Sequence, residues 1–188
     1  RGDTLRDYLT GILPASGWDA MRLPLLVNAV DLATGRTEWF GAGARTDVSL
    51  VEALYASAAL PVLYPPAEIG GRFFVDGGTQ QPLGLLRAAE AGATGILGID
   101  VGSGEEADAE QVLRQGIPAV HQRILSMVTH RLRRELVDAW QGPPLLYVRP
   151  RLDGYGGFDF QHIDYFVEEG YRAMSVALGP GKGPPRRP

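Results

Sequence analysis

The sequence feature best suited to chemistry is a carboxylate followed by two glycines. Asp76 comes directly after the short run Arg72 to Val75 and immediately before Gly77 and Gly78. The run predicts a strand, and the ligands of open α/β sheets bind where the strands end. Glycines let the backbone turn sharply and let a substrate approach closely. The motif therefore predicts either a functional carboxylate at a sheet edge or only a turn, since Asp-Gly is also a common turn sequence.

Strands and helices alternate along the chain that must position this carboxylate. The predicted strands cover residues 25–32, 36–40, 72–75, 95–101 and 145–148. The predicted helices cover residues 4–12, 49–59, 82–92, 118–140 and 164–178. This alternation predicts the α/β class with a largely parallel sheet. Residues 179–188 are too rich in glycine and proline to fold alone, so we predict a disordered tail there.

Composition narrows the function classes. The 188 residues carry 18 Lys and Arg against 22 Asp and Glu, and this net charge of −4 predicts no binding to nucleic acid. Cysteine is absent, which excludes disulfides, thiolate metal sites and a cysteine nucleophile, and fits a cytoplasmic location. His121 and His130 fall on opposite faces of one predicted helix and cannot share a metal. We therefore expect no metal and no cofactor.

Further motifs surround Asp76 in a definite order. They are VDLATG at residues 30–35, ASAALP at 56–61, YPP at 64–66, IGGR at 69–72, QPL at 81–83 and GA at 92–93. In order and spacing, this series resembles the second half of the patatin-like phospholipases, and the resemblance covers roughly residues 4–178.

The resemblance implies a fold and an activity. The fold would be a three-layer α/β/α patatin-like domain with a largely parallel central sheet. Residues 1–178 would form its C-terminal two-thirds, with the N-terminal part missing. The activity would be that of a lipid acyl hydrolase, a phospholipase or esterase, that uses a Ser-Asp dyad with Asp76 as the base. A carboxylate can deprotonate a serine only if burial raises its proton affinity.

The nucleophile of this family lies in a Gly-x-Ser-x-Gly elbow, and this sequence has no such pattern. None of its six serines has glycine two residues away on both sides. We interpret Ser57, within the ASAALP motif, as a structural residue. We therefore expect the chain to supply the aspartate but not the serine, and to be inactive by itself. The alternative is a catalytically silent relative that binds lipid or a partner.

Three further interpretations concern the partners and the other aspartates. The implied substrate is a phospholipid or another acyl ester, and a basic helix face would allow peripheral membrane contact: Arg123, Arg131, Arg133 and Arg134. Asp31 and Asp100 also end predicted strands, and we interpret both as turn or capping residues. A sugar-kinase phosphate loop at residues 76–79 is disfavoured because Gln80-Gln81-Pro82 leads into a helix rather than a hairpin.

Overall fold

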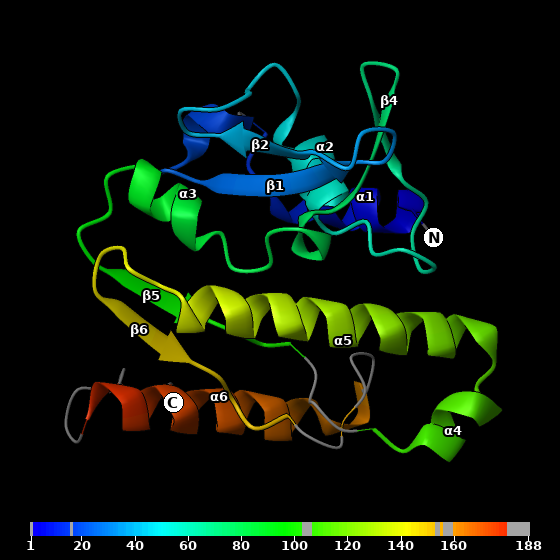
Figure 1. The fold of residues 1–188 in the computed structure, drawn as a ribbon. Coiled ribbons are helices and arrows are strands. Elements are labelled where there is room, and N and C mark those ends of the chain that lie inside the picture. The colour runs from blue at the N-terminus through cyan, green and yellow to red at the C-terminus, as the bar shows by residue number, and fades with distance from the viewer. Residues whose placement is uncertain (1, 16, 103–106, 153–154, 156–159, 180–188) are drawn as a thin grey trace. The chain divides into compact units, whose positions relative to one another are not determined.

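The computed structural model describes residues 2–15, 17–102, 107–152, 155 and 160–179 (Figure 1). The chain forms two compact units, Arg1–Pro82 and Leu83–Pro188. Within the described ranges, none of the helices combines the length and the apolar character needed to span a bilayer. Of the predicted tail, 179–188, residues 180–188 lie outside the described residues, and a single domain over residues 1–178 stays a prediction.

The first unit contains a four-stranded sheet in the order β2-β1-β4-β3. Its strands are β1 (Leu26–Asp31), β2 (Thr37–Gly41), β3 (Ala67–Ile69) and β4 (Arg72–Asp76). All its pairings are antiparallel. Tight turns at Thr34-Gly35 and Gly70-Gly71 connect β1 to β2 and β3 to β4. A connection this short can only link antiparallel strands. β3 was not predicted because Pro65-Pro66 indicated an irregular segment.

Two helices complete the core of the first unit: the second packs on the sheet, and the first packs on the second (Figure 1). They are α1 (Gly2–Ile12) and α2 (Leu50–Ser57), with the short 3-10 helices η1 (Gly17–Ala20) and η2 (Gly77–Thr79) nearby in the chain. The Ser49 hydroxyl accepts a hydrogen bond from the Glu52 N–H at 3.2 Å, which confirms the predicted helix start. Phe40 and Phe74 are fully buried and meet edge to face at 6.0 Å.

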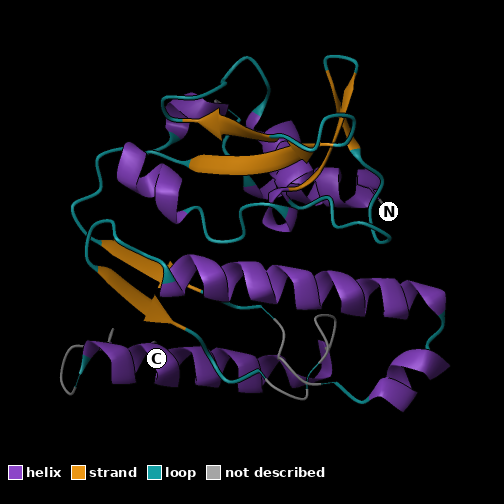
Figure 2. Cartoon of the chain, viewed as in Figure 1, coloured by secondary structure: helices purple, strands orange, loops and turns teal. Residues whose placement is uncertain are grey.

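The second unit is built around one parallel strand pair, β5 (Ile96–Ile99) with β6 (Leu145–Val148), as Figure 2 shows. Its helices are α3 (Leu85–Glu90), α4 (Ala109–Arg114), the long α5 (Ile117–Asp138) and α6 (Ile163–Leu178), with the short 3-10 helix η3 (Phe160–His162) before α6. Pro118 stands in the first turn of α5, where its missing N–H costs no hydrogen bond.

The α/β class is confirmed, but the largely parallel central sheet is not. Among the described strands, β5 and β6 are the only parallel pair, whereas the four strands of the first unit are antiparallel. Alternating strands and helices predicted parallel crossovers. β4 instead pairs antiparallel with β1 and, through a tight turn, with β3. The three-layer arrangement stays a prediction.

The basic face predicted on the long helix is also corrected. Arg133 is only 7% exposed, and its Nε lies 2.9 Å from Oδ2 of the buried Asp100. Arg131 lies on the surface and pairs with Glu135, one helical turn later, at 2.6 Å. Spacing alone placed these arginines in solvent, but α5 packs Arg133 inward because a buried carboxylate faces it.

Candidate active site

The sheet places Asp76 at the end of β4. Its backbone lies opposite Ala29 in the central strand β1. Its N–H donates a 3.1 Å hydrogen bond to the carbonyl of Ala59, just beyond the end of α2. The backbone of Asp76 is therefore fixed from two sides, by a neighbouring strand and by the loop that follows a helix. Neither Ala29 nor Ala59 carries a charge.

The two glycines after Asp76 form the short helix η2, which the carboxylate itself caps. Oδ1 of Asp76 accepts a hydrogen bond from the Gly78 N–H at 2.6 Å. The Thr79 hydroxyl donates to the Asp76 carbonyl at 2.9 Å. A Cβ atom at position 78 would lie 2.8 Å from Oδ1 of Asp76. A side chain at position 78 would therefore displace the Asp76 carboxylate from the position in which it caps η2.

A second residue of β1 contacts this turn. The Asn28 side-chain amide donates to the carbonyls of Gly77 and Gln81, at 3.4 and 3.1 Å. A Cβ atom at Gly77 would lie 2.3–2.4 Å from the Asn28 side chain and from its backbone oxygen. Gly77 is therefore required because Asn28 occupies the space that any other side chain would need.

The surroundings of Asp76 favour a proton acceptor. The residue is half-buried, and this desolvation raises the pKa of its carboxyl, an effect that the Gly78 hydrogen bond only partly opposes. Within the described ranges, Oδ1 accepts that one bond and Oδ2 accepts none. The carboxylate thus combines raised proton affinity with an oxygen free to take a proton, as a general base requires.

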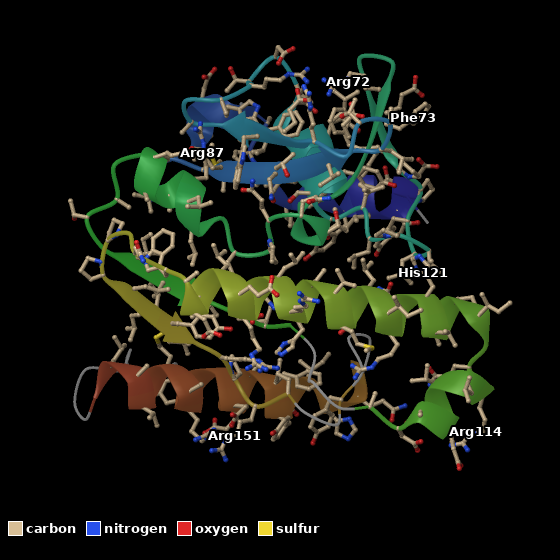
Figure 3. The ribbon with its side chains drawn as sticks, in the orientation of Figure 1. Arg72, Phe73, Arg87, Arg114, His121 and Arg151 are labelled. Carbon is tan, nitrogen blue, oxygen red and sulfur yellow. The ribbon has the colours of Figure 1, made fainter. Side chains whose placement is uncertain are left out.

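Asp31, at the end of β1, is surrounded differently. Its Oδ1 accepts hydrogen bonds from the N–H groups of Ala33 and Thr34, at 2.8 and 2.9 Å. Its Oδ2 is held by the Arg72 guanidinium at 2.6–2.7 Å. The Thr34 N–H above all holds the pKa of Asp31 below its ordinary value. Figure 3 shows the side chains of Arg72 and Phe73 leaving β4 on opposite sides. Asp31 therefore caps a turn, as predicted.

Asp100, after β5 in the second unit, is also satisfied. Its Oδ1 accepts a hydrogen bond from the Gly102 N–H at 2.8 Å, and its Oδ2 accepts one from the Tyr147 hydroxyl at 2.7 Å beside Arg133. Burial, then the bond to Asp100, raises the pKa of Tyr147 to about 12. The carboxylate is 3% exposed. The capping interpretation fits this aspartate too.

Among the described residues, no serine or histidine is hydrogen-bonded to the Asp76 carboxylate. Ser57 is the last residue of α2, and Ser16 and Ser103 lie outside the described residues. In the ranges that the structure describes, no three His, Asp or Glu side chains come together as a metal site. Sequence reasoning missed Asn28, although it is the only asparagine in the chain and stands three residues before Asp31.

Comparison with known proteins shows which family the first unit is similar to. Residues 2–89 match the family model of the patatin-like phospholipases, a segment that contains the whole described part of the first unit and most of α3. Over these residues the chain is similar to the patatin-like phospholipases, which confirms the resemblance seen in the sequence.

Particular relatives point the same way. An uncharacterized NTE family protein of Mycobacterium bovis is 28% identical over 109 residues, which are 58% of this chain and 29% of that protein. A protein of the same description from Mycobacterium tuberculosis matches equally well. Lysophospholipase NTE1 of Debaryomyces hansenii is 29% identical over 133 residues, which are 61% of this chain and 9% of that protein. The chain spans less than a third of the length of these relatives.

Proposed function

We propose that this chain provides the carboxylate base of a lipid acyl hydrolase that works through a Ser-Asp dyad, with Asp76 as the base. The observation that carries the proposal is the state of Asp76, which is desolvated, raised in pKa and bonded through only one oxygen among the described contacts. The patatin-like match over residues 2–89 and the similarity to a lysophospholipase support a phospholipid or other acyl-ester substrate.

The reaction needs a serine, which the complete protein would provide in an elbow that these 188 residues do not contain. Asp76 takes the hydroxyl proton while the serine Oγ bonds to the acyl carbonyl carbon. The ester C–O bond then breaks, and the leaving oxygen takes that proton from Asp76. Water repeats the sequence on the acyl-serine, which releases the fatty acid and restores both groups.

Replacing the carboxylate by an amide tests this role. In the complete protein, Asp76→Asn keeps the shape and the bond to Gly78 but cannot accept a proton. We expect hydrolysis of a short-chain p-nitrophenyl ester to fall about a hundredfold or more, within the range of general-base catalysis. Asp31→Asn and Asp100→Asn are matched controls that should lower the melting temperature and leave kcat nearly unchanged. Turnover of Asp76→Asn within a few-fold of the parent would rule out the dyad.

A second candidate is a catalytically silent protein that binds lipid or a partner. It is favoured by one observation, the absence of Gly-x-Ser-x-Gly around all six serines. Under both proposals the 188-residue chain alone hydrolyses no ester. The complete protein separates them, because only the hydrolase turns over the ester and loses that turnover to a serine-directed fluorophosphonate.

We also propose a cytoplasmic location and peripheral contact with lipid. The basic face of α5 gives that contact less support than its spacing suggested, because Arg133 and Arg131 are engaged by Asp100 and Glu135. A three-layer fold with a further, N-terminal part remains our proposal for the complete domain.

A further inference from the structure

We propose that Asn28 is a positioning residue for Asp76: its side-chain amide clamps the turn that carries the carboxylate. The inference rests on the proposed function and deepens it, because it names a second residue of the same site. Asn28 and Gly77 are 49 positions apart in the chain. Only the antiparallel pairing of β1 with β4 brings them together.

The geometry of the clamp comes from strand register. Ala29 lies opposite Asp76, so the preceding residue of β1 faces the residue that follows Asp76. The Asn28 amide has two N–H groups, and it donates to two carbonyls of the turn, those of Gly77 and Gln81. These carbonyls belong to the first residue of η2 and to a residue just after it. The amide therefore fixes both ends of the turn against the central strand.

The second observation is independent of those hydrogen bonds. The Cα atom of Gly77 is packed so closely on Asn28 that a Cβ would meet the side-chain oxygen, the side-chain carbon and the main-chain oxygen of Asn28. The Gly78 N–H that bonds Oδ1 of Asp76 belongs to the next residue. A shift of the turn away from Asn28 would move that donor and hydrate the carboxylate. Asn28 thus acts on catalysis through the placement of Asp76.

The sequence offers a direct probe, because Asn28 is its only asparagine. Labelling with 15N-asparagine gives a single side-chain amide in the NMR spectrum of the 188-residue chain. We expect its shifts to follow the titration of Asp76 across an acid-to-neutral pH series. The same series in Asp76→Asn should be flat. This measurement uses the parent side chain and does not depend on whether an Asn28 variant folds.

Two variants then remove the clamp. In Asn28→Ala and Asn28→Ser, we expect the pKa of Asp76, measured from its carboxyl carbon, to fall toward the ordinary aspartate value as water reaches the turn. Trp18→Phe is the matched control, since it removes another side-chain donor of the first unit, the 2.7 Å bond from the indole N–H to the Val48 carbonyl. It should lower stability and leave the Asp76 titration in place.

In the complete protein, Asn28→Ala should lower kcat about tenfold or more with little change in KM, because a small misplacement of a catalytic group is costly. The acid limb of its pH-rate profile should move to lower pH. An Asn28 amide that does not sense Asp76, or an unchanged Asp76 pKa in both variants, would overturn the inference. If Asp76→Asn still kept full activity, the proposed function would fail instead, whatever the NMR result.

Discussion

Two strand ends in the first unit carry an aspartate followed by a turn, and they differ in what surrounds the carboxylate. Asp31 accepts two backbone hydrogen bonds and an arginine on its two oxygens. Asp76 accepts one, from Gly78, among the described contacts. The first carboxylate is stabilised in its charged form, whereas burial disfavours the charged form of the second. A similar local sequence therefore yields a structural anion in one place and a candidate base in the other.

The charges around Asp31 extend its structural role. Arg72 also contacts Glu38 of β2 at 2.7 Å, and Glu38 is paired in turn with Arg45. One arginine of β4 thus connects β1 with β2 at the end of the sheet opposite Asp76. A carboxylate in such a network has little capacity left to accept a proton, so Asp31 has a structural role and Asp76 remains the candidate base.

The largest expected difference between the two turns is the stability lost when a glycine of each turn is replaced by alanine. Gly77→Ala would place a Cβ 2.3–2.4 Å from three atoms of Asn28, so we expect a loss of about 3 kcal/mol, the upper end of the usual cost of overpacking. Gly35→Ala, in the turn after Asp31, meets no atom within 4 Å but has a φ of +66°, which costs about 1–2 kcal/mol. Urea unfolding of both variants measures which one loses more free energy of unfolding. A larger loss for Gly35→Ala would contradict the close packing at Gly77.

Glu169, a carboxylate of the second unit, extends the comparison to the effect of acid on stability. Hydrogen bonds from Arg172, then from the Arg151 N–H, lower the pKa of Glu169 to about 2. Its stabilisation is complete above the ordinary value of 4.5 and is lost as the pH falls toward 2. Glu169→Gln should therefore melt below the parent at pH 6 and with it near pH 2. Glu168→Gln, at an exposed neighbour, should show no such dependence in thermal melts, and the same dependence there would break the assignment.

The smallest expected effect is on the melting temperature at pH 7, which we expect Asp76→Asn to raise and Asp31→Asn to lower. The raised pKa of Asp76 makes its ionised form a cost to folding that grows as the pH rises above the ordinary value of 3.8. Asp76→Asn should therefore melt above the parent at pH 7 and with it under acid. Asp31, lowered in pKa, stabilises the fold above 3.8, so Asp31→Asn should melt below the parent at pH 7. If both variants shifted the melting temperature in the same direction across a pH series, the proposed difference between the two aspartates would be wrong.

Much of the fold followed from local patterns, because those patterns act within a few residues. The sequence predicts strands over residues 25–32 and 36–40 and helices that begin near residues 49 and 118. The structure has β1 and β2, and the starts of α2 and α5, at these places. The short elements β3 and α4 were not predicted: two prolines precede β3, and α4 has only six residues, too few for a clear periodic pattern. The direction of β4 was not predicted, because it depends on antiparallel pairing with β1, which lies far from it in the sequence, and with the unpredicted strand β3.

For the candidate site, the sequence by itself determined the turn and its chemistry: a carboxylate, two glycines and the order of motifs around them. Tertiary structure decided the rest. Pairing between β1 and β4 set Asn28 against Gly77, burial raised the pKa of Asp76, and cross-strand and cross-element contacts occupied Asp31 and Asp100 with Arg72 and Arg133. The physical reason is that solvation and hydrogen-bond saturation depend on atoms that are distant in the chain, so three similar strand-end aspartates become distinguishable only once the chain has folded.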